Sequence, residues 1–137
     1  MANRLCGKIV SVTQGQIHVC VQILWKDISL SVIITRFSCD DMRLSVGDTI
    51  SVIIKNTDIM LAKAFHGMLS ARNRAKGIVK KIVKGDVLSK VFVESRGDML
   101  HVIITNISLG EMNIHEGDEV TAIVKSTELI LSKEVQH

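Results

Sequence analysis

The stretch Ile34-Thr35-Arg36-Phe37-Ser38 recurs as Ile104-Thr105-Asn106-Ile107-Ser108, a shift of 70 residues from position 34 to position 104. The same shift, without an insertion, relates further pairs: Gly7 and Gly77, Gly15 and Gly85, Lys55 and Lys125, and Lys63 and Lys133. A repeat with a fixed offset indicates two copies of one domain. We expect the first domain to span residues 1–66 and the second to span residues 67–137 of the chain.

Each copy contains five segments that are rich in β-branched residues and bounded by Gly, Asp, Asn or Ser, as β-strands are. In the first copy they are Leu5–Val12, Gln16–Leu24, Asp27–Thr35, Asp48–Lys55 and Asp58–Lys63. After the third segment, Arg36–Leu44 and its counterpart Asn106–Ile114 each predict one short helical turn, with Ser38 and Ser108 as N-caps. The sequence therefore predicts an all-β fold of two tandem OB-like five-stranded β-barrel domains, each with one short helical turn.

Composition and targeting signals narrow the class of protein. Hydrophobic residues make up 47% of the chain and charged residues 23%, which is typical of a folded domain. No apolar run approaches the roughly 18 residues that cross a bilayer, and no signal-peptide core follows the N-terminus. We therefore expect a cytoplasmic protein without a membrane partner. The three cysteines show no C-x-x-C spacing, so we expect them to be reduced and mostly buried.

The most unusual stretch is Ser70-Ala71-Arg72-Asn73-Arg74-Ala75-Lys76-Gly77, directly ahead of the second copy's first strand. Arginine offers a planar fork of N–H donors, and serine, asparagine and exposed backbone N–H groups add neutral donors. Such a set suits a tetrahedral oxyanion, which only accepts hydrogen bonds. A solvated basic linker is the alternative interpretation.

Lys55 and Lys125 strengthen the oxyanion interpretation, because each ends a matching apolar strand and precedes a polar turn. A strand-end lysine can also lay its stem over a barrel mouth and discourage edge pairing. Thr35 and Thr105 end the two V-I-I-T strands and could line the same mouth. They could equally cap the turn that follows.

No catalytic pattern is present, so we expect a binding protein and not an enzyme. The sequence has no P-loop, no nucleophile elbow and no H-E-x-x-H motif, and its five histidines are scattered singly. An OB-type nucleic-acid binder is one alternative, but it would stack bases on aromatic side chains in a basic groove. With a net charge of +3 and only Trp25, Phe37, Phe65 and Phe92 as aromatics, we expect no nucleic-acid partner.

Three pieces of the second copy together resemble the molybdate-binding Mop (molbindin) domain. They are Ser70-Ala71-Arg72-Asn73 with Lys76-Gly77, the I-T-N-I-S stretch, and E-G-D-E-V-T-A-I-V-K-S-T at residues 116–127. The resemblance covers nearly the whole chain and is that of a two-domain molbindin. It implies a molybdate-binding protein for storage or homeostasis, with tungstate as a second candidate ligand, or a sensor that signals the ion to a partner protein.

The resemblance also implies where the ion binds and how chains assemble. In the family the oxyanion lies at interfaces between domains and subunits, held by the S-A-R-N segment of one domain and the Lys-Ser segment and threonine of another. Carried over, these residues are Ser70, Ala71, Arg72, Asn73, Thr105, Lys125 and Ser126, with Thr35, Lys55 and Asn56 as first-copy equivalents. Family members form rings of six domains, so we expect a homo-oligomer and favour a homotrimer.

The first copy departs from this pattern. Arg72 corresponds to Ala2, and Ser70 corresponds to a position ahead of Met1. The first copy therefore lacks half of its own oxyanion receptor. We expect Lys55 to complete a site with the Ser70–Arg72 segment of a neighbouring copy.

Overall fold

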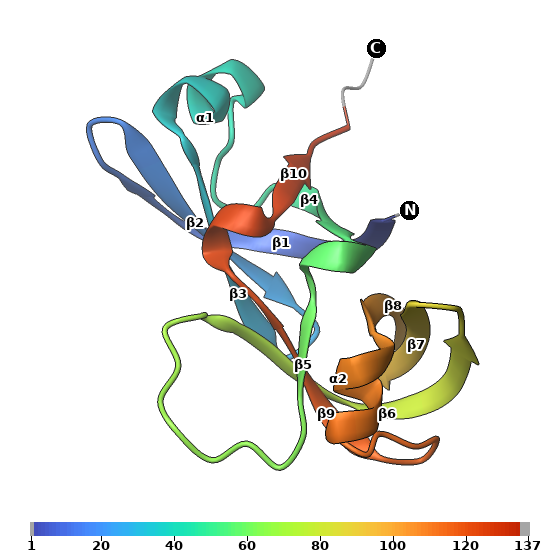
Figure 1. The fold of residues 1–137 in the computed structure, drawn as a ribbon. Coiled ribbons are helices and arrows are strands. Elements are labelled where there is room, and N and C mark those ends of the chain that lie inside the picture. The colour runs from blue at the N-terminus through green and yellow to red at the C-terminus, as the bar shows by residue number, and fades with distance from the viewer. Residues whose placement is uncertain (1, 135–137) are drawn as a thin grey trace.

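The computed structural model describes residues 2–134, which form two curled, antiparallel five-stranded sheets (Figure 1). The first copy contributes β1 (Ala2–Gln14), β2 (His18–Trp25), β3 (Ile28–Thr35), α1 (Arg36–Met42), β4 (Thr49–Lys55), the 3-10 turn η1 (Asn56–Asp58) and β5 (Met60–Ala62). The second copy contributes β6 (Asn73–Lys84), β7 (Leu88–Ser95), β8 (Asp98–Thr105), α2 (Asn106–Glu111), β9 (Glu119–Val124), η2 (Ser126–Glu128) and β10 (Ile130–Ser132). The predicted all-β architecture is confirmed.

The curl of each sheet has the same local cause. The pairing of β1 with β2 shifts register between Ile9 and Ser11, and that of β6 with β7 shifts between Val79 and Lys81. A β-bulge of this kind bends a strand and increases its twist. Gly7 lies just before the first bulge, where a Cβ atom would come within 2.6 Å of the Leu24 carbonyl oxygen. The glycine therefore permits the close approach that the bend requires.

The two short helices lie where the sequence predicts them, but their N-caps are different residues. Thr35 caps α1, because its hydroxyl oxygen accepts a 3.1 Å hydrogen bond from the Ser38 backbone N–H. Thr105 caps α2 in the same way through the Ser108 N–H. The prediction of Ser38 and Ser108 as caps is wrong, because each helix begins three residues earlier and these serines lie inside it.

The last strand of each copy pairs with the sheet of the other copy. The sheet orders are β10-β4-β1-β2-β3 and β5-β9-β6-β7-β8. Thus Met60 of the first copy lies opposite Ile123 of the second, and Ile130 of the second lies opposite Ile53 of the first. A fifth strand does form within the predicted segment 58–63, but in the other copy's sheet. Each five-stranded sheet therefore contains residues of both copies.

Two buried asparagines fasten the copies together with matching hydrogen bonds. Asn3 accepts from the His101 backbone N–H at 2.8 Å and donates to the His101 carbonyl at 2.9 Å. Asn73, its counterpart, accepts from the Ser31 N–H at 2.7 Å and donates to the Ser31 carbonyl at 2.9 Å. Each amide thus binds the edge strand of the opposite copy as another strand would.

A second reciprocal pair of contacts lies at the Gly-Asp turns. Lys63 forms a 3.0 Å ion pair with Asp118, and Lys133 forms a 3.0 Å ion pair with Asp48. Hydrogen bonding to Lys133 is the main cause that lowers the pKa of Asp48. For Asp118 the main cause of the lowered pKa is the His115 backbone N–H, with Lys63 second. These contacts fix the residues that follow β5 and β10, the two strands that pair with the sheet of the other copy.

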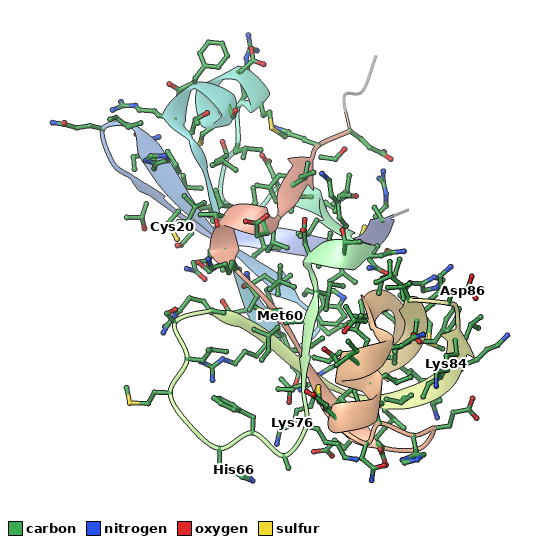
Figure 2. All side chains as sticks on the ribbon, in the orientation of Figure 1. Cys20, Met60, His66, Lys76, Lys84 and Asp86 are labelled. Atoms are coloured by element: carbon green, nitrogen blue, oxygen red, sulfur yellow. The ribbon has the colours of Figure 1, made fainter. Side chains whose placement is uncertain are left out.

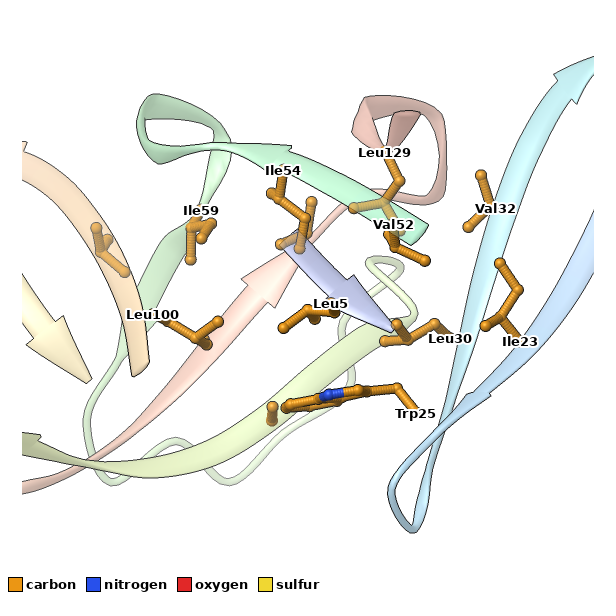
Figure 3. Packing of buried hydrophobic residues seen from close by; sticks show 14 of the residues in the cluster. Leu5, Ile23, Trp25, Leu30, Val32, Val52, Ile54, Ile59, Leu100 and Leu129 are labelled. Atoms are coloured by element: carbon orange, nitrogen blue, oxygen red, sulfur yellow. The ribbon is translucent and has the colours of Figure 1, made fainter. Parts of the chain in front are cut away.

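One hydrophobic core runs through both copies, with Trp25 packed against aliphatic side chains near their junction (Figure 3). The Trp25 indole N–H donates a 2.7 Å hydrogen bond to the Asp98 carboxylate of the other copy. An apolar cavity of about 30 Å³ lies beside it, lined by residues of both copies.

The expectation of mostly buried cysteines is wrong, because only Cys39 is buried. No helix among residues 2–134 is long and apolar enough to cross a membrane.

Candidate functional site

The Ser70–Asn73 segment leads from the loop after β5 into β6, and its side chains alternate in and out. Ala71 and Asn73 are buried, whereas Ser70 and Arg72 are exposed. The buried side chains anchor the backbone, and Arg74 ties it further by donating to the carbonyls of Ala71 and Leu69. The exposed serine and arginine are therefore presented from a segment that is held on both sides.

Arg72 and Lys125 each lie directly beyond the end of a strand of the second sheet. The ladder of β6 and β9 ends at the pair of Asn73 and Val124, and Arg72 and Lys125 are the next residues along the chain on either side of that pair. Both side chains are exposed, so two cations meet at this edge of the second sheet.

The next residue, Ser126, carries an unusual feature. Its hydroxyl oxygen is enclosed, and among the described residues it has no hydrogen-bond partner. A buried polar group without a partner costs about 1–3 kcal/mol, so such groups usually have a function or an unseen ligand. We name Arg72, Lys125 and Ser126, together with Ser70, the second-copy edge.

The equivalent first-copy edge, formed by Ala2, Lys55 and Asn56, is built differently. Ala2 pairs with Lys55, so a methyl group occupies the place of the guanidinium. Asn56 is buried and accepts a 3.2 Å hydrogen bond from the side chain of Asn3. Lys55 is exposed. This edge offers one cation to an anion, where the second-copy edge offers two.

The threonines end strands that pack against the turns following the lysines, β3 against η2 and β8 against η1. Thr35 ends β3 and Thr105 ends β8, which are the outermost strands of their sheets. Thr35 lies four residues beyond Ser31, the partner of Asn73, which is about 13 Å along an extended strand. Both threonine hydroxyls cap helices, as one of the two sequence interpretations predicts.

The structure gives Asn73 and Arg74 positioning roles next to the predicted binding residues. The amide of Asn73 is committed to Ser31, so this residue positions the segment. Sequence reasoning missed the clamp made by Arg74, although the residue lies in the same basic stretch. The Ser70–Asn73 and Lys125–Ser126 segments, which the resemblance divides between two domains, are neighbours on one sheet here. No group of three His, Cys, Asp or Glu residues suited to a cation occurs in the described part of the chain.

Comparison with known proteins agrees with this architecture. The model of the TOBE domain matches twice, over residues 1–61 and 69–131. The chain belongs to the TOBE domain family. It contains two tandem TOBE domains, and its resemblance to the Mop proteins is confirmed by the relatives that follow.

The similar proteins carry molybdenum in their names. Molybdenum-pterin-binding protein MopB of Rhodobacter capsulatus is 30% identical over 133 residues, which are 95% of this chain and 49% of that protein. Molybdenum-pterin-binding protein 2 of Clostridium pasteurianum is 41% identical over 64 residues, which are 46% of this chain and 94% of that protein. The chain thus spans about half the length of the Rhodobacter protein, and the Clostridium protein matches just under half of this chain.

A solved structure has the same two-domain TOBE fold. It is the cytoplasmic molybdate-binding protein ModG with molybdate bound, and it superposes with a TM-score of 0.91. The alignment covers 96% of each chain at 24% sequence identity. At this identity the likeness establishes the fold, including the tandem arrangement of OB-like units.

Proposed function

We propose that this protein binds molybdate reversibly at the second-copy edge and serves to store or buffer the ion in the cytoplasm. The observation that carries the proposal is the position of Arg72 and Lys125 directly beyond the last pair of β6 and β9, with the enclosed Ser126 hydroxyl next along the chain. The names of the relatives, which speak of molybdenum and molybdate, support the choice of ion.

The chemistry of the edge fits a tetrahedral dianion. Molybdate and tungstate accept hydrogen bonds only, and the edge offers a guanidinium fork, an ammonium and the hydroxyls of Ser70 and Ser126. One cation about 4 Å from a unit negative charge contributes on the order of 4 kcal/mol at an effective dielectric of 20, before desolvation is subtracted.

A complete oxyanion site of this kind needs residues from more than one chain. Thr35 and Thr105 end the outermost strands and their hydroxyls cap helices, so we infer that they reach a shared oxyanion when another chain contributes one of the parts. Exposed apolar side chains recur at matching positions, with Phe37 79% and Ile107 73% exposed. Such side chains suit subunit contacts. We propose a homotrimer of six domains, in which Lys55 and Asn56 meet a neighbouring chain's Ser70–Arg72 segment.

Equilibrium dialysis with molybdate, tungstate and sulfate tests the proposal. We expect molybdate uptake at micromolar ion, together with an assembly mass of three chains in solution. Arg72→Gln should abolish most of the uptake, whereas Lys84→Gln, which removes an exposed charge near the far end of β6, should leave it unchanged (Figure 2). Equal uptake by both variants would refute the assigned edge, and no uptake by the wild-type protein would refute the function.

A further inference from the structure

A second basic pocket lies on the second sheet, under the loop that joins the copies. It encloses about 300 Å³ and is lined by Phe65, Arg74, Lys76, Arg96, Thr121 and Ile123. Figure 2 shows Lys76 close to this loop, at the same end of the molecule as His66. Three of the six lining side chains are cations.

The two arginines of this pocket are held in place by neighbouring groups. Arg96 donates to the Lys76 carbonyl at 3.0 Å and to the Asp27 carboxylate at 3.0 Å. Arg74 donates to the carbonyls of Ala71 and Leu69. Each guanidinium has five N–H donors, so each keeps donors that these contacts do not use. Both are therefore fixed in position before any ligand arrives.

Lys76 is the uncommitted cation of the pocket. Its side chain is exposed and forms no hydrogen bond or ion pair with any described residue. Glu94 and Glu119 line an adjoining groove of about 250 Å³, which shares Lys76 and Arg96 with the pocket. Neither glutamate forms an ion pair within the described part of the chain. Asp27 pairs with Arg96, and the lining of the pocket itself contains three cations and no carboxylate.

The floor of the pocket is the β6–β9 sheet, where Ile123 lies opposite Arg74 and Thr121 lies opposite Lys76. Phe65 comes from the loop and supplies the aromatic side chain of the lining. A pocket of about 300 Å³ is the lower end of the size range for small organic ligands, and a bare oxyanion would leave most of it empty. Cations beside an aromatic ring match a ligand with an anionic group attached to a flat ring.

We propose that this pocket binds a small phosphorylated molecule with a flat ring. The phosphate lies against Lys76 and the free donors of Arg96, and the ring packs against Phe65. This site goes beyond the oxyanion edge: Lys76 is four residues from Arg72 along β6, about 13 Å in an extended strand.

The first copy does not reproduce the pocket. Cys6 takes the place of Lys76 and Ser51 that of Thr121. These two residues line a groove with two carboxylates, Asp48 and Glu134, and a single cation, Lys133, which is already paired with Asp48. The basic pocket is therefore a property of the second copy.

Calorimetric titration of the full chain with adenosine monophosphate tests the proposal, with adenosine and inorganic phosphate as comparison ligands. We expect one nucleotide per chain and much weaker binding of either comparison ligand. Lys76→Gln should weaken nucleotide binding about tenfold, since it removes a charge-assisted hydrogen bond. Phe65→Ala should weaken it as well, and Lys84→Gln should not change it.

The outcomes separate this site from the molybdate edge. Arg72→Gln should leave nucleotide binding intact while it removes molybdate binding, and Lys76→Gln should do the reverse. The proposal is overturned if the nucleotide does not bind, if Lys76→Gln binds it as tightly as the wild-type chain, or if phosphate alone binds equally well. None of these results would alter the case for molybdate.

Discussion

The edge that carries Lys55 and the edge that carries Lys125 have the same backbone and different side-chain chemistry. At the first, Ala2 faces the lysine and the Asn56 amide is satisfied by Asn3. At the second, Arg72 and the lysine follow the last paired residues of adjacent strands, and the Ser126 hydroxyl is enclosed without a described partner. The scaffold accommodates both versions. The duplicated fold therefore preserves structure in both copies, and only the second carries an arginine beside the strand-end lysine.

The largest expected difference between the two edges is the loss of molybdate affinity when the lysine of each is replaced. We expect Lys125→Gln to weaken molybdate binding on the order of 100-fold, because charge-assisted contacts to a buried dianion are worth about 1.5–3 kcal/mol each. Lys55→Gln should have a smaller effect, because only a neighbouring chain can complete that edge. Calorimetric titration of both variants measures the difference. Equal losses would show that the two edges contribute alike.

A second prediction concerns the asparagine contacts, in which the copies are alike. Asn3→Ala and Asn73→Ala should each lower the free energy of unfolding by about 2–4 kcal/mol, because each leaves one backbone N–H and one carbonyl without their partner. Urea denaturation measures this. Asn73→Ala should also reduce molybdate affinity, since Asn73 positions Arg72, whereas Asn3→Ala should affect stability alone. Molybdate affinity lost equally in both variants would contradict this separation.

The sequence predicts the strands well because the two copies support each other. The runs of β-branched residues recur with a constant shift, and the turn residues that bound them recur as well. The sequence cannot predict that β5 joins the sheet of the other copy, because the residues of 60–62 suit a strand equally well in either sheet. The asparagine contacts cannot be predicted either, because each partner is a backbone group of the other copy and leaves no signal in residue type.

The candidate site is predicted in part. Arg72 and Lys125 are singled out by residue type, and the structure then places each directly beyond the last pair of β6 and β9. The threonines are ambiguous in sequence, because a hydroxyl at a strand end serves equally as a ligand or as a helix cap. Thr35 and Ser38 lie three residues apart and both suit a cap, and only backbone geometry shows that Thr35 takes this role.

A third, smaller effect is expected at Ser126 and Asn56, which occupy equivalent positions. Ser126→Ala should leave stability unchanged or raise it by up to about 1 kcal/mol, since a buried hydroxyl without a partner is removed. Asn56→Ala should lower stability by about 1 kcal/mol, because a hydrogen bond from Asn3 is lost. Thermal unfolding with and without molybdate measures both. Ser126→Ala should also reduce the stabilisation that molybdate gives, and an undiminished ligand effect would remove Ser126 from the site.

The smallest expected difference lies at the Gly-Asp turns, where both ion pairs are partly exposed. The folded-state pKa of Asp48 and of Asp118 is lowered from the usual 3.8. Each carboxylate therefore adds stability that is complete above its unfolded pKa and is lost as the pH falls through the folded pKa. Asp48→Asn and Asp118→Asn should accordingly flatten the fall of the melting temperature between about pH 5 and pH 2.

The two turns should nevertheless respond differently when their lysines are removed. Lys133 is the main cause of the low Asp48 pKa, whereas the His115 backbone N–H is the main cause for Asp118 and Lys63 comes second. Lys133→Met should thus raise the pKa of Asp48 more than Lys63→Met raises that of Asp118. Carboxyl chemical shifts followed by NMR during acid titration measure both values. Equal pKa shifts would mean that Lys133 and Lys63 lower the pKa of their carboxylates to the same degree, and would contradict the expected difference.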